Sequence, residues 1–130
     1  MVTFLNPESL HSPGAAYSHS ALVTAGSDLV FISGQIGIRP DGSLASGLTE
    51  QADQVFSNIS ALLGASGLGA ADIVKLTMFV VAGHDIQAVR RSRSSFLGSH
   101  RPASTAVFVP QLADPAWLVE VEAVAARSGS

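Results

Sequence analysis

Residues 118–125 alternate so regularly between apolar and other side chains that they constrain the fold more than any other stretch. Successive side chains of a strand point to opposite faces, so one face of this segment is wholly apolar and must be covered. The other face holds Glu120 and Glu122, roughly 7 Å apart at ~3.3 Å per residue. Leu118 and Val124 flank these two carboxylates. This face is either a solvated sheet surface or the lining of a site.

The composition indicates a globular chain with more apolar than charged surface. Of the 130 residues, 47% are apolar and 13% are charged, a low share of charge for a monomer that covers itself with water-compatible groups. We therefore expect part of the surface to be buried against other subunits. The length predicts a single domain over residues 1–130.

Several functional classes are excluded by the same composition. The chain has no cysteine, so disulfides, Cys-bound zinc and thiol nucleophiles are excluded. The four histidines lack metal-ligand spacing, and we expect no metal site. A net charge of −3 predicts no nucleic-acid partner, and no apolar run approaches the ~20 residues of a membrane span. The N-terminus does not resemble a signal peptide, which favours a cytoplasmic location.

The periodicity predicts two helices and five strands. Helices are expected over residues 49–65 and 86–98, the second with Asp85 as its N-cap. The strands are predicted at 19–24, 28–36, 73–82, 103–109 and 116–125. A turn at 26–28 is expected to join the first two strands as a hairpin. The order ββαβαββ predicts an α+β fold in which both helices cover one face of a mixed sheet.

The uncovered face of that sheet predicts an assembly. It is expected to present the apolar side chains of Phe79, Val81, Phe108, Leu118 and Val124. Because this is too much apolar surface to leave in water, we expect a homo-oligomer that packs these faces together. Glu120 and Glu122 would then lie in or beside an interface, where burial could adapt a carboxylate to acid–base chemistry.

The second predicted helix carries arginines on its apolar side. On a helical wheel Arg90 and Arg93 share the sector of the apolar residues, whereas Arg91 points away. Either their long stems carry the guanidinium groups to the rim, or one guanidinium binds an anionic ligand or Glu120 across an interface. The sequence alone leaves both possibilities open.

Segments along nearly the whole chain resemble the Rid family of reactive intermediate deaminases, also called the YjgF family. The resembling segments are residues 6–7 (NP), 13–18 (PGAAYS), 30–36 (VFISGQI), 72–80 (DIVKLTMFV), 101–107 (RPASTAV) and 118–125 (LVEVEAVA). Their shared order, more than any one of them, carries the resemblance.

The resemblance implies a chorismate-mutase-like fold and a homotrimer with a small-molecule pocket at each subunit interface. Typical members hydrolyse short-lived enamines and imines and need no cofactor. Their pockets hold a tyrosine from the early loop and a glutamate of the last strand, which correspond to Tyr17 and Glu120 as catalytic residues here. The resemblance also carries over Ser33 of the 30–36 strand as a substrate-binding residue.

One departure from the family pattern changes the expected substrate. The arginine that grips the substrate carboxylate is replaced by Ser104, and a neutral hydroxyl cannot form a bidentate ionic clamp. Ala106 stands where cysteine is common and Phe108 where an acidic residue is common, so the expected pocket is less polar.

Three interpretations follow. The chain hydrolyses a different imine or enamine with Glu120 and Tyr17; or Arg90 replaces the missing arginine for the usual 2-imino acid; or the trimer binds a small molecule without catalysis. The role of Glu122 is also open: it faces the same cavity, or it pairs with Lys75 or an arginine.

Overall fold

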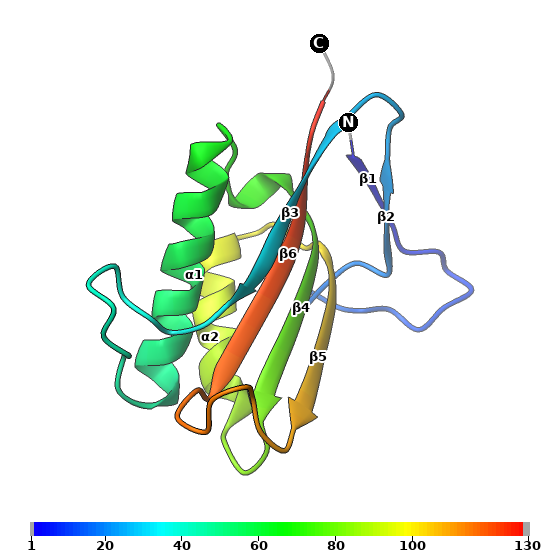
Figure 1. Ribbon diagram of the computed structural model, residues 1–130. Helices are drawn as coiled ribbons and strands as arrows, with labels where there is room; N and C mark the ends of the chain where they lie inside the picture. Colours follow the sequence, from blue (N-terminus) through cyan, green and yellow to red (C-terminus); the bar gives the residue numbers. More distant parts are fainter. Residues whose placement is uncertain (1, 129–130) are drawn as a thin grey trace.

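The computed structural model describes residues 2–128, which form a four-stranded sheet, a separate two-stranded sheet and two α-helices (Figure 1). The strands are β1 (Val2–Leu5), β2 (Ser20–Val23), β3 (Asp28–Gln35), β4 (Ile73–Val81), β5 (Ala103–Val109) and β6 (Val119–Arg127). The helices are α1 (Gly47–Ala65) and α2 (Ile86–Leu97), and a short 3-10 helix spans Ala70–Asp72. The predicted α+β class is confirmed, and both predicted helices agree with the structure to within two residues at each end.

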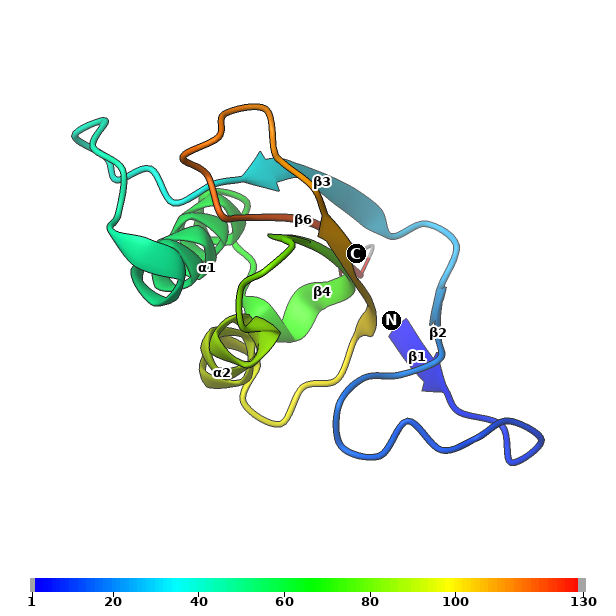
Figure 2. The same cartoon turned by 90° about the horizontal axis from the view of Figure 1, so that it is seen from below.

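The four-stranded sheet has the order β3-β6-β4-β5 and is mixed, as predicted. β4 and β5 run parallel because α2 crosses between them, whereas β6 is antiparallel to both β3 and β4. Both helices lie on the same side of the sheet (Figure 2). The alternating face of β6 is covered as its pattern requires, since Val119, Val121 and Ala125 are fully buried there.

The predicted hairpin between the first two strands is wrong. β2 pairs with β1, a strand that was not expected from the sequence, and β3 pairs with β6. The turn itself exists, because the amide of Ser27 donates to the carbonyl oxygen of Thr24 at 3.3 Å. It redirects the chain from one sheet to the other. β1 has four residues, too few for a clear alternation to be recognised.

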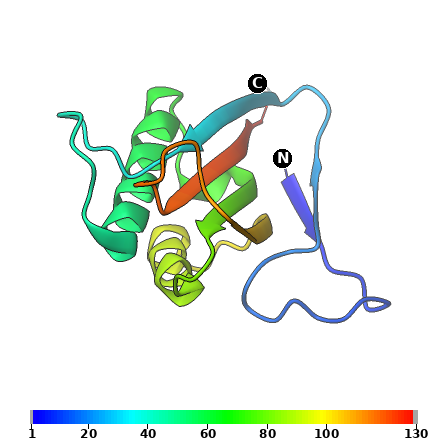
Figure 3. The ribbon, with the colours of Figure 1, turned by 60° about the horizontal axis from the view of Figure 1, so that its bottom comes forward.

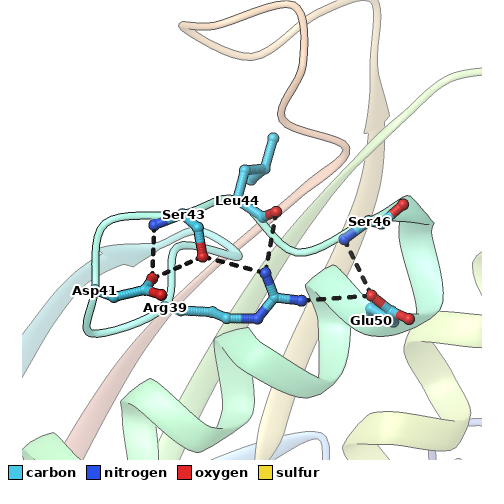
Figure 4. A network of polar contacts seen from close by, with 6 residues as sticks. All are labelled: Arg39, Asp41, Ser43, Leu44, Ser46 and Glu50. Carbon is cyan, nitrogen blue, oxygen red and sulfur yellow. Dashed lines mark hydrogen bonds and ion pairs between the residues drawn. The ribbon is translucent and has the colours of Figure 1, made fainter.

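Local hydrogen bonds define both helix starts. Asp85 caps α2 as predicted, since its side chain accepts from the amide of Gln87 at 2.9 Å. At the start of α1, Glu50 accepts from the amide of Ser46 at 3.1 Å and pairs with Arg39 at 3.5 Å (Figure 4). The contacts of these side chains join α1 to the loop that precedes it.

The same loop holds Asp41 in two hydrogen bonds from Ser43, one from its hydroxyl at 2.6 Å and one from its amide at 2.9 Å (Figure 4). These bonds lower the pKa of the Asp41 carboxyl below its usual value because they favour the charged form. Their contribution is therefore present at neutral pH and is lost as the pH falls through that lowered pKa.

A buried glutamine connects α1 to the entrance of β6. Gln51 is 2% exposed; its Nε2 donates to the carbonyl oxygen of Ala116 at 3.2 Å and its Oε1 accepts from the amide of Leu118 at 2.8 Å. Because Gln51 belongs to α1 and bonds to the backbone just before β6, it fixes where β6 begins. The Glu120 position follows from this anchor, two residues after Leu118.

We call the side of the sheet opposite α1 and α2 the open face. It is partly apolar, as predicted, but the residues that form it differ from those expected. The register places Phe79, Val107 and Val124 on this face together with the exposed Leu29 and Phe31. No helix of residues 2–128 covers it (Figure 3). The expectation for Phe108 was wrong, because Phe108 pairs with the buried Val80 and so shares the helix side of β5. The alternation of residues within β5 cannot show which face Phe108 occupies, because that face depends on how β5 pairs with β4.

Within residues 2–128, none of the helices combines the length and apolar character needed to cross a membrane.

Candidate functional site

Part of the predicted site converges on one cavity. A cavity of about 430 Å³ lies beside α2 and β5. Its lining consists of Ala16, Tyr17, Arg90, Arg93, Ser104 and Ala106. Four of these residues were predicted site residues: Tyr17, Arg90, Ser104 and Ala106. They come from the early loop, α2 and β5, which are far apart in the sequence.

The early loop is fastened to the start of β5, and this places Tyr17 at the cavity. Ser18 is buried and bridges to Ala103; its amide donates to the carbonyl oxygen of Pro102 at 3.1 Å and its hydroxyl to that of Arg101 at 2.6 Å. The Arg101 guanidinium donates in return to the carbonyl oxygen of Ala15. The loop around Tyr17 is therefore held by backbone groups on both sides.

Arg90 and Arg93 lie one helical turn apart on α2 and both reach the cavity, as their sector on the wheel predicted. Arg93 is partly buried, and this burial lowers its pKa, with Arg90 and Arg101 adding positive charge nearby. Ion pairs in the described chain join Arg39 to Glu50 and Arg127 to Asp28. No carboxylate of residues 2–128 pairs with Arg90 or Arg93.

β5 contributes the small side chains of the lining. Ser104 and Ala106 alternate with outward-facing residues and point to the helix side, because they pair with the buried Leu76 and Met78. Phe108 lies two residues further along this face and is 52% exposed. Phe108 does not line the cavity, although it was predicted to be a substrate-binding residue.

Glu120 lies on the opposite face of the sheet. It pairs with Phe79, and its carboxylate forms no hydrogen bond or ion pair within the described residues. Ser33 is exposed on the same face, on the neighbouring strand β3. Within one chain the predicted catalytic pair of Tyr17 and Glu120 is therefore separated by the sheet.

Gly34, which was not among the predicted site residues, provides the space for Glu120. β3 shifts register between Ile32 and Gln35, and Gly34 lies within this irregularity. A Cβ placed on Gly34 would overlap Oε2 of Glu120 and lie 2.7 Å from its Cδ. Only glycine leaves room for the carboxylate as it stands. The position of Gly34 in the 30–36 motif was the one sign in the sequence that this glycine matters. The motif does not show that Gly34 lies against Glu120 of another strand.

The second carboxylate of β6 has no charged partner here. Glu122 is exposed and pairs in register with Thr77. Lys75, one of its possible partners, donates instead to the hydroxyl of Thr105 at 2.6 Å. In the described chain Glu122 therefore neither lines the cavity nor forms an ion pair.

A larger, shallower cleft of about 500 Å³ lies between α1 and α2. The hydroxyl of Ser92 donates there to Asp53 at 2.5 Å, so this pair is satisfied within the chain. None of the predicted site residues lines this cleft. No cluster of three potential metal ligands occurs among the described residues.

The fold and the cavity together define the structural class of this protein. It is a small α+β protein with two helices on one face of the sheet and a pocket between α2, β5 and the early loop. The family model described as endoribonuclease L-PSP matches residues 9–127. The chain belongs to this family, the Rid or YjgF family, as its motifs predicted.

Relatives and a solved structure agree with this assignment. Protein HMF1 of Saccharomyces cerevisiae is 34% identical over 132 residues, covering 98% of both chains. The 2-iminobutanoate/2-iminopropanoate deaminase of Salmonella typhimurium is 35% identical over 121 residues, covering 90% of this chain and 93% of that one. The crystal structure of the Rid-family protein YyfB from Yersinia pestis superposes with a TM-score of 0.84 and 28% identity, covering 95% of this chain and 97% of that one.

Proposed function

We propose that this chain is an imine or enamine hydrolase whose substrate differs from the usual 2-imino acids and binds between the subunits of a homotrimer. The observation that carries the proposal is the division of the site residues between two surfaces. Tyr17 and Ser104 meet at the cavity, whereas Glu120 lies on the open face without a hydrogen-bond or ion-pair partner among residues 2–128. These groups can act on one substrate only if a second copy brings its open face to the cavity.

Such a contact can close into a ring. An interface that joins the edge of one copy to the face of the next is heterologous, and a heterologous interface gives a cyclic oligomer when the rotation between copies closes and an open filament when it does not. The exposed apolar residues of the open face support this packing: Phe31 is 74% exposed and Leu29 is 49% exposed. A trimer is the ring that the family resemblance implies.

The assembly predicts a mass of three 13.3 kDa chains in light-scattering measurements after gel filtration. Phe31→Asp places a charge in the proposed interface and is expected to give monomers. Leu62→Asp is the matched control, because Leu62 is an exposed leucine of α1 outside the open face, and we expect it to keep the trimer. A wild-type monomer at micromolar concentration would contradict the proposed assembly.

The proposed chemistry is the addition of water across the C=N bond. Glu120 accepts a proton from the attacking water while the new C–O bond forms, and it returns the proton to the nitrogen. The hydroxyl proton of the resulting carbinolamine then passes to the nitrogen as the C–N bond breaks and the C=O bond forms, which releases ammonia and a carbonyl compound. The Tyr17 and Ser104 hydroxyls orient the substrate by hydrogen bonds. The name of the Salmonella relative supports deamination as the reaction, while Ser104 argues against the same substrate.

The test is the decay of imines generated by amino-acid oxidases, followed with and without the protein. We expect little acceleration of 2-iminopropionate decay by the wild type and a gain in Ser104→Arg, since arginine restores a carboxylate clamp. Other imines, neutral and doubly charged, are compared in the same assay, with Ser104→Ala as the size-matched control. Acceleration of none of these imines by the wild type would contradict the hydrolase proposal.

The alternative is a trimer that binds a small molecule without catalysis. The replacement of the carboxylate-binding arginine by Ser104 favours it, because a pocket can keep its fold and lose its chemistry. Saturable ligand binding without turnover in any imine assay would select this alternative.

A further inference from the structure

The cavity beside α2 has more positive charge than the chain itself neutralises. Arg90 and Arg93 both line it, and no acidic side chain does. Arg101 adds charge nearby, although its guanidinium is occupied by the carbonyl oxygens of Ala15, Gly98 and His100. The described chain therefore presents two guanidinium groups, without partners, to one cavity.

This arrangement has an energetic cost that a ligand can remove. Burial of Arg93 and its proximity to Arg90 disfavour its charged form, and the pKa of Arg93 falls accordingly. Arginine remains charged in proteins at neutral pH, so the repulsion persists until an anion binds. Since Arg90 and Arg93 lie one turn apart on the same helix, their guanidinium groups can bind one ligand together.

We propose that Arg90 and Arg93 form an anion subsite that selects ligands with two negative charges. Counted on the groups of the described chain alone, a monocarboxylate would balance one guanidinium and leave the other uncompensated, whereas a dicarboxylate or a phosphate monoester balances both. Tyr17 and Ser104 supply neutral hydroxyl donors at the same cavity. The inference rests on the proposed function in one respect: if the chain is a hydrolase, its imine or enamine substrate carries two negative charges.

The test measures binding of unreactive probes to the assembled protein by calorimetry at low salt. The probes are succinate and inorganic phosphate as dianions, propionate as a monoanion and propionamide as a neutral analogue. We expect at least one dianion to bind about tenfold or more tightly than propionate, with an affinity that falls as salt rises. Tighter succinate binding indicates a dicarboxylate substrate, and tighter phosphate binding indicates a phosphate monoester.

Three arginine variants separate the subsite from general charge. Arg90→Gln and Arg93→Gln are each expected to weaken dianion binding about 10- to 100-fold. Arg91→Gln removes the same charge from a residue of α2 that does not line the cavity, and it is expected to leave binding unchanged. Equal binding of propionate and the dianions by the wild type, or equal losses in all three variants, would overturn the inference.

Two further outcomes distinguish this inference from the proposed function. Dianion binding that depends on Arg90 and Arg93, without hydrolysis of any imine, supports the subsite and contradicts only the hydrolase. Hydrolysis unaffected by either substitution supports the hydrolase and overturns the subsite. Loss of the oligomer in Arg90→Gln and Arg93→Gln, with unchanged anion affinity, would mean that these arginines pair with carboxylates of a neighbouring copy, which also overturns it.

Discussion

Glu120→Gln is expected to lower the rate of imine hydrolysis by about 10²- to 10⁴-fold, the usual contribution of a positioned acid–base group. The amide keeps the size of the side chain but cannot accept the proton from water. Because Glu120 has no hydrogen-bond or ion-pair partner within the described chain, the substitution leaves no group of this chain unpaired. The measurement is the initial rate on the fastest imine substrate of the wild type, with the melting temperature and oligomer mass determined in parallel.

Gly34→Ala tests the position of the carboxylate and leaves its chemistry intact. The added methyl group would overlap Oε2 of Glu120 and must displace that flexible side chain. We expect a loss of rate approaching that of Glu120→Gln, with little change in stability. Gly69→Ala is the control, because nothing lies within 4 Å of a Cβ at Gly69 and its φ of −139° is open to any residue.

Retention of the full rate in Glu120→Gln would exclude Glu120 as the acid–base group. Retention in Gly34→Ala alone would show that the carboxylate can act from more than one position. A loss of rate in Gly69→Ala equal to that in Gly34→Ala would show that the short distance between Gly34 and Glu120 does not explain the effect.

Gln51→Ala is expected to reduce the free energy of unfolding by about 3 kcal/mol. It deletes a side chain that is 2% exposed and leaves the amide of Leu118 and the carbonyl oxygen of Ala116 without their partners. Each unsatisfied polar group costs about 1–3 kcal/mol where water cannot replace the partner, and the vacated space adds to the loss. Urea denaturation measures the change, with the m-value expected to stay the same.

Gln54→Ala is the matched control on the same helix. Gln54 donates to Asn58 at 2.8 Å in an i,i+4 pair and is only partly buried, so about 0.5 kcal/mol or less is expected. Equal effects of the two substitutions would show that Gln51 does not anchor β6. We expect Gln51→Ala also to reduce activity, because the start of β6 positions Glu120.

The elements that the sequence predicted well are those with internal periodicity. α1 and α2 repeat apolar residues every three or four positions, and Asp85 is a favourable N-cap, so their bounds could be predicted closely. The alternation in β4 and β6 likewise predicted which face would be buried. β1 was missed and the hairpin was wrong, because the pairing of β2 with β1 depends on residues 15 or more positions apart.

The candidate site was predictable in its residue types and not in its arrangement. The motifs named Tyr17, Ser104 and Glu120 only through the family resemblance, since no local pattern links an early loop to two late strands. The structure placed Tyr17 and Ser104 at one cavity and Glu120 on the other face of the sheet. The predicted face of Phe108 was wrong because its orientation follows its pairing with Val80.

The amino-acid sequence by itself determined the helices, the long strands, the family and the presence of a neutral serine at position 104. These properties depend on contacts within a few residues or on the motifs themselves. Only the tertiary structure decided that Arg90 and Arg93 share a cavity with Tyr17, and that Gly34 makes room for Glu120. Such relations arise where strand pairing and helix packing bring distant segments together, so no local spacing in the chain can encode them.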